Sequence, residues 1–73
     1  VYPNPASDFL RLKNNSPVTS QFVLTDINGR IVKEMLLGGR TENTVQISDL
    51  PRGMYLVRFS NTETTIAKKV LIQ

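Results

Sequence analysis

Hydrophobic and polar residues alternate along most of this chain, which is the two-residue period of strands with one buried face. No stretch has the convincing spacing of an amphipathic helix. The pattern predicts strands over residues 9–13, 18–25, 30–37, 44–48, 54–60 and 64–72. The apolar residues expected to share a face within their segments are Leu10 and Leu12, Phe22 and Leu24, Val45 and Ile47, and the trio Tyr55, Val57 and Phe59.

Turn sequences separate these segments. Asp26-Ile27-Asn28-Gly29 is the clearest, because Asn-Gly accepts the positive φ of tight turns, and it predicts a β-hairpin. In Leu50-Pro51-Arg52-Gly53 the proline presets φ and the glycine tolerates a left-handed exit. Asn14–Pro17, Gly38-Gly39 and Asn61-Thr62 provide the other breaks. Six or seven short strands at this spacing predict one compact sandwich over residues 1–73.

Composition restricts the chemistry that the chain is able to perform. It has 73 residues, with no cysteine and no histidine, so the commonest general base, thiol chemistry and the usual metal ligands are missing. We therefore expect no enzyme activity, no catalytic or metal-binding residues and no cofactor. Asp26-x-Asn28-Gly29 lacks the later glutamate of a calcium loop, which leaves a hairpin turn as its interpretation.

Charge and chain ends add two expectations. Nine Lys and Arg oppose six Asp and Glu, but they are scattered, and Lys68-Lys69 is the only adjacent basic pair, so nucleic-acid binding is not expected. No apolar run approaches the roughly 20 residues that span a bilayer. The chain begins at Val1 rather than methionine, which suggests a domain cut from a larger secreted protein.

Four motifs, in order, resemble those of type A C-terminal sorting domains of the type IX (Por) secretion system. Val1–Ala6, with Pro3, Asn4 and Pro5, resembles the family's opening motif, and Leu24–Val32 its hairpin. Leu50–Val57 resembles its glycine-x-tyrosine motif, and Lys68–Gln73 its basic-then-aliphatic terminal segment. The resemblance covers the whole chain.

The resemblance implies an all-β fold, an immunoglobulin-like antiparallel β-sandwich of about seven short strands. It also implies a signal that directs an upstream cargo through the periplasm and across the outer membrane, in bacteria of the Bacteroidetes type. The implied partners are the type IX translocon with its outer-membrane shuttle protein, and a sortase-like surface peptidase that cuts upstream of Val1. The cargo would then be at the cell surface or extracellular.

The residues that the resemblance makes candidates for translocon recognition also have structural interpretations. The prolines would stiffen the chain entry, Gly53 would serve a turn, and Tyr55 would fill the core. At least one of the two lysines should be exposed, where it would either protect an edge strand or present charge to a partner. The candidates are Pro3, Asn4, Pro5, Gly53, Tyr55, Lys68, Lys69, Val70 and Ile72.

Two other functions stay open. An immunoglobulin-like accessory or adhesion module of an extracellular enzyme would have the same strand pattern, although the lack of tryptophan disfavours a sugar-binding surface. An anion- or membrane-surface domain would use the basic residues, and its binding would depend strongly on salt. Either kind of domain, or a sorting domain, could form a homodimer through an exposed edge strand.

Overall fold

The computed structural model describes residues 8–73, and all of their regular structure is β-strand. The predictions for Pro3, Asn4 and Pro5 lie outside the described residues. No helix that could cross a membrane occurs in the part of the chain that is described. The strands are β1 (Phe9–Lys13), β2 (Ser20–Thr25), β3 (Ile31–Leu37), β4 (Glu42–Gln46), β5 (Gly53–Ser60) and β6 (Thr65–Ile72).

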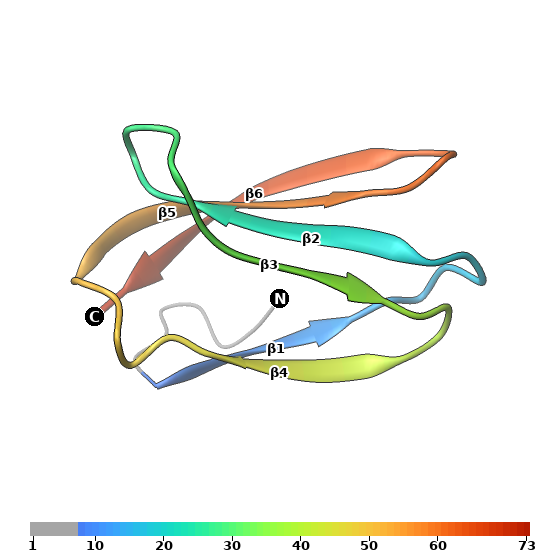
Figure 1. Cartoon of the computed structure of the whole chain (residues 1–73), viewed down its shortest axis with the longest axis horizontal. Coiled ribbons are helices and arrows are strands. Elements are labelled where there is room, and N and C mark those ends of the chain that lie inside the picture. The colour runs from blue at the N-terminus through green and yellow to red at the C-terminus, as the bar shows by residue number, and fades with distance from the viewer. Residues whose placement is uncertain (1–7) are drawn as a thin grey trace.

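The strands form two antiparallel sheets that lie one above the other (Figure 1). The larger sheet has the order β3-β2-β5-β6, and the smaller sheet pairs β1 with β4. In the larger sheet β2–β3 and β5–β6 are hairpins, while β2 and β5 pair across the chain. The predicted all-β sandwich is therefore confirmed, with six strands in residues 8–73 where about seven were expected for the whole chain.

The core lies between the inner faces of the two sheets. Each pair predicted to share a face does so, because alternate side chains of a strand point the same way. The aromatic rings of Phe22 and Phe59 meet inside, with centroids 5.6 Å apart. Phe59 is only partly buried, whereas Tyr55 and Val57 are buried. The buried hydrophobic cluster consists of Leu10, Leu12, Phe22, Leu24, Leu37, Val45, Ile47, Tyr55, Val57, Val70 and Ile72.

Strand boundaries differ from the prediction mainly at β4. The pattern predicted 44–48, and the strand is Glu42–Gln46. Ile47 lies beyond the strand yet stays fully buried, and its N–H donates to the carbonyl of Asp8 at 2.9 Å. The hydrophobic pattern marked the buried positions correctly, but pairing with β1 decides where the strand ends.

A β-bulge at the base of the β2–β3 hairpin changes the face of one apolar residue. Leu24 pairs with Lys33, but Thr25 pairs with Ile31, so Val32 is the extra residue of β3. Val32 packs against the core, while Ile31 is 57% exposed on the outer face of the larger sheet. The bulge thus places a large apolar side chain in solvent.

Two loops join at the end of the sandwich opposite this hairpin. The Arg40 N–H donates to the Ser16 carbonyl at 2.9 Å, and the Asn14 N–H donates to the Thr41 carbonyl at 2.8 Å. The loops lie so close that a Cβ built on Gly39 would be 2.2 Å from the Pro17 carbonyl oxygen. Gly39 is therefore needed for this approach, beyond its role as a strand breaker.

We expect Gly39→Ala to destabilise the domain by about 1–3 kcal/mol, because the backbone of one loop must move to admit the methyl group. Gly38→Ala is the matched control, since its Cβ would meet Thr41 Cγ2 at an ordinary 3.4 Å. Denaturant unfolding followed by circular dichroism measures both. Equal midpoints for the two variants would show that the loops separate at little cost.

Candidate functional site

The terminal motif Lys68–Gln73 begins on β6, which comes last in the order β3-β2-β5-β6 of the described strands. One side of β6 pairs with β5 along its whole length, from Ser60 with Thr65 to Gly53 with Ile72. Lys69 and Leu71 each make a further interaction, so β6 does not offer an unpaired backbone edge at these residues.

Lys68 and Lys69 are both exposed, as the sequence allowed. They lie opposite Val57 and Leu56 of β5, so Lys68 shares the inner face and Lys69 the outer face of the sheet. Lys68 stays exposed on the inner face, and its neighbour on the same side, Ile66, is 50% exposed. The amino-terminal half of β6 therefore extends beyond the shelter of the smaller sheet.

Val70 and Ile72 are buried, each with 1% of its surface exposed. Their side chains fill the core rather than a contact surface, and their burial fixes β6 against β5. Val70 lies opposite Tyr55, and Ile72 lies opposite Gly53. Four of the candidate residues thus form two cross-strand pairs at the same end of the sheet, separated by the pair of Met54 with Leu71.

Tyr55 is 7% exposed, and its hydroxyl donates to the carbonyl of Pro51 at 2.6 Å. This arrangement corresponds to the tyrosine corner of immunoglobulin-like sandwiches, where a tyrosine hydroxyl bonds to backbone a few residues upstream. The bond fixes the Leu50–Gly53 turn to the strand that follows it. Gly53 begins β5 with φ +150°, a conformation that residues with a Cβ rarely adopt. Both residues therefore serve the fold directly, as their structural interpretations predicted.

The predicted hairpin Asp26–Gly29 joins β2 to β3. Its turn is closed by Gly29 N–H donating to the Asp26 carbonyl at 3.0 Å, and Gly29 has φ +86°. Hydrogen bonds to the Asp26 carboxylate, first from the Arg30 N–H and then from the Asn28 N–H, hold the pKa of Asp26 below its usual value. The Arg30 guanidinium adds an ion pair at 3.3 Å. The side chain of Asp26 therefore stabilises the turn of the hairpin to which it belongs.

Comparison with protein families gives one match. The family model described as a secretion system C-terminal sorting domain matches residues 1–73, the entire chain. No match was found among curated proteins or among solved structures. The family is one of type IX sorting signals rather than of catalysts, and such a signal implies export across the outer membrane to the cell surface or beyond.

The family match covers all four motifs, and three of them lie in the described residues. The hairpin, the glycine-x-tyrosine motif and the terminal basic-aliphatic segment include parts of all four strands of the larger sheet, with the β2–β3 turn and the turn before β5. The sandwich and the tyrosine corner are those expected of an immunoglobulin-like module. The chain belongs to the family of type IX secretion system C-terminal sorting domains.

Proposed function

We propose that this domain is the C-terminal sorting module of a longer secreted protein, and that the translocon recognises the terminal segment on β6. The observation that carries the proposal is the exposure of Lys68 and Lys69 on this strand, within a chain that the sorting-domain family matches throughout. Exposed charge gives a partner a contact that does not depend on the cargo. A signal attached to many cargoes requires that independence.

In this proposal the candidate residues have two roles. Lys68 and Lys69 present positive charge on β6 and favour an acidic surface of the partner. Val70, Ile72, Tyr55 and Gly53 act indirectly, because they hold β6 and the turn before β5 in place. Pro3, Asn4 and Pro5 belong to the opening motif and would contribute to recognition at the junction with the cargo.

The route follows from the family. The partners would be the type IX translocon and its outer-membrane shuttle protein, reached from the periplasm. A sortase-like surface peptidase would then cut upstream of Val1 and separate the cargo from the domain. The domain itself would be substrate and address, with no catalytic role.

A homodimer through β6 is the alternative, but charge disfavours it. Fully overlapped antiparallel pairing of two β6 strands would bring both lysine pairs side by side, and like charges in that position are destabilising. We therefore assign the exposed lysines of β6 to an acidic surface of the translocon rather than to a second copy.

A reporter fusion tests the proposal. Val1–Gln73 is placed behind a periplasmically targeted fluorescent protein in a bacterium with a working type IX system. The test variant carries Lys68→Glu with Lys69→Glu, since deleting the whole segment would also remove core residues. The matched control carries Arg11→Glu with Lys13→Glu, the same charge change at exposed positions of β1.

We expect the parent and control fusions to reach the surface or medium, and the β6 variant to stay in the periplasm. Circular dichroism of the purified domains checks that all are folded. Export of all three would show that the charge of the two lysines is only protective and is not needed for recognition. Periplasmic retention of a folded parent would contradict an autonomous signal and favour an accessory or adhesion module.

A further inference from the structure

The tip of the β2–β3 hairpin carries Asn28 and Gly29, both exposed, and it projects beyond the strands beside it (Figure 1). No other asparagine of the chain precedes a glycine. Asn-Gly is the sequence most prone to spontaneous deamidation, because glycine has no side chain to shield its backbone nitrogen. A Cβ built on Gly29 would meet nothing within 4 Å, so solvent reaches this peptide bond.

Deamidation at this position would proceed through a cyclic imide. The Gly29 nitrogen loses its proton to solvent and forms a bond to Cγ of Asn28. The bond from Cγ to Nδ2 breaks, and the amide nitrogen leaves as ammonia. Water then opens the imide, at Cγ to give aspartate or at the main-chain carbonyl to give isoaspartate, whose peptide bond runs through Cγ. Water is the only co-reactant.

The fold does not restrain the side-chain amide of Asn28. In residues 8–73 no hydrogen bond joins this amide to another group, although the Asn28 backbone N–H donates to the Asp26 carboxylate at 2.9 Å. By contrast, the Asn14 amide donates to three backbone carbonyls. The Asn61 side-chain oxygen accepts from two backbone N–H groups. Such bonds fix the group that would be attacked at Asn14 and Asn61, but not at Asn28.

The backbone of the turn opposes ring closure. Among the described residues only Arg40 and two glycines have positive φ, so φ is negative at Ile27 and Asn28. Together with the bond from the Gly29 N–H to the Asp26 carbonyl at 3.0 Å, this defines a type I turn. The third residue of such a turn has a ψ of about 0°, which eclipses the next nitrogen with the residue's own nitrogen rather than with its Cβ. The imide needs the second arrangement, because its ring is planar.

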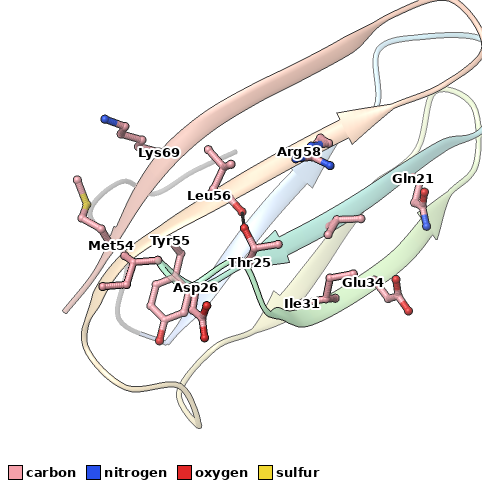
Figure 2. Close-up of a pocket in the computed structure, with 13 residues that line it drawn as sticks. Gln21, Thr25, Asp26, Ile31, Glu34, Met54, Tyr55, Leu56, Arg58 and Lys69 are labelled. Carbon is pink, nitrogen blue, oxygen red and sulfur yellow. Dashed lines mark hydrogen bonds between the residues drawn. The ribbon is translucent and has the colours of Figure 1, made fainter.

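Hydrogen bonds hold the turn in this form. Asp26 follows the last residue of β2 (Figure 2), and its carboxylate accepts from the Asn28 N–H. The Gly29 N–H is bonded to the Asp26 carbonyl, so its proton is harder to remove. The Thr25 hydroxyl donates to the Leu56 carbonyl of β5 at 3.5 Å and anchors the base of the hairpin (Figure 2). Deamidation therefore requires the hairpin to open.

We propose that Asn28 is a deamidation site that the folded hairpin suppresses and the unfolded chain exposes. The extent of deamidation at Asn28 then records how long the chain has been unfolded. This inference does not depend on the proposed sorting function, because it uses only the hairpin and water.

Isoaspartate at position 28 would not fit the folded turn. It adds one carbon to the main chain before Gly29, inside a loop that two backbone hydrogen bonds close at 3.0 Å. In these bonds the Gly29 N–H donates to the Asp26 carbonyl, and the Asp26 N–H donates to the Arg30 carbonyl. The register of β2 with β3 depends on this loop. The isoaspartate form should therefore unfold at a lower denaturant concentration than the parent.

Mass spectrometry of the 73-residue domain tests the inference. The domain is kept in mildly alkaline buffer with and without urea, and its peptides are followed for the replacement of –NH2 by –OH. In urea we expect Asn28 to react faster than Asn15 and Asn43, which are exposed and precede serine and threonine. In buffer the reaction at Asn28 should be about tenfold slower than in urea, because the turn must open first.

Variants of the turn separate its effect from that of overall folding. Asp26→Ala removes the carboxylate that holds the turn and should accelerate deamidation of the folded domain several-fold. Asp26→Asn keeps an accepting oxygen and should restore part of the protection. The matched control is Glu34→Ala, which removes an exposed carboxylate of β3 outside the turn and should react like the parent. Circular dichroism checks that each variant is folded.

Three outcomes would overturn the inference. They are equal rates at Asn28 in buffer and in urea, a rate in urea no higher than at Asn15 and Asn43, and equal rates for folded Asp26→Ala and Glu34→Ala. If Asp26→Ala is unfolded, the comparison of the parent in buffer and in urea still decides. Export of the reporter fusion is measured separately, so failure of this inference is distinguishable from failure of the proposed function.

Discussion

Replacing Tyr55 by alanine is expected to destabilise the domain by about 3–5 kcal/mol. The side chain is 7% exposed and belongs to the central cluster, so its loss leaves a cavity between the sheets. It also removes the hydrogen bond from its hydroxyl to the Pro51 carbonyl. A domain of this size has a free energy of unfolding of roughly 4–10 kcal/mol, so the variant should be close to unfolded at physiological temperature.

Tyr55→Phe separates the ring from the hydroxyl. It keeps the packed ring and removes only the bond to Pro51, so it should cost about 1–2 kcal/mol. Guanidinium unfolding followed by circular dichroism gives both values. If Tyr55→Phe lowers the free energy of unfolding as much as Tyr55→Ala does, the hydrogen bond to Pro51 contributes more to stability than the packing of the ring. If Tyr55→Ala lowers the free energy of unfolding by less than the roughly 1–2 kcal/mol expected for Tyr55→Phe, Tyr55 is not a core residue.

Asn14→Ala is expected to cost about 2–4 kcal/mol, although the residue lies in a loop. Its side-chain amide donates to the carbonyls of Val18, Leu37 and Gly38 at 3.0, 3.3 and 3.0 Å. Its oxygen accepts from the Ser16 N–H at 3.0 Å. Alanine would leave buried and part-buried backbone groups of two segments without these partners, and burying an unpaired polar group is costly.

Two further variants of this site sharpen the test. Asn15→Ala changes the exposed neighbouring residue and should alter the free energy of unfolding by no more than about 0.5 kcal/mol. Asn14→Asp keeps the accepting oxygen but loses the donors, and so should destabilise at least as much as alanine at neutral pH. Thermal unfolding of the four proteins compares them. A midpoint for Asn14→Ala equal to that of Asn15→Ala would refute the role of this side chain.

Asn14 also shows the limit of reading turns from sequence. Asn14–Pro17 was correctly predicted to interrupt the strands, because Asn, Ser and Pro favour turns. The sequence does not show that Asn14 contacts Leu37 and Gly38, which lie 23 and 24 residues away. Those partners are backbone carbonyls, which every residue carries, so no residue type marks them. Gly39 is similar, since its close neighbour is the backbone of Pro17.

For the candidate recognition residues, too, the sequence showed some features and only the structure showed the others. The motifs located β6 and the turn before β5, and they identified Tyr55, Lys68 and Lys69 by number. Only the structure shows that β6 comes last in the order β3-β2-β5-β6 of the described strands, because a hydrophobic pattern does not specify which strands are neighbours. The exposure of Ile31 on the outer face of the larger sheet was not predicted. It needs the bulge at Val32, which turns Ile31 outward.

By itself the sequence determined the local features of this protein: the period-2 strands, the hairpin at Asp26–Gly29, the inward residues of each strand and, through its motifs, the sorting-domain family. These depend on neighbours along the chain, where alternation and turn chemistry act directly. Tertiary structure alone decided the strand order, the pairing of β2 with β5 and the Asn14 network. Those features depend on contacts between segments distant in sequence, whose energies arise only when the two sheets pack.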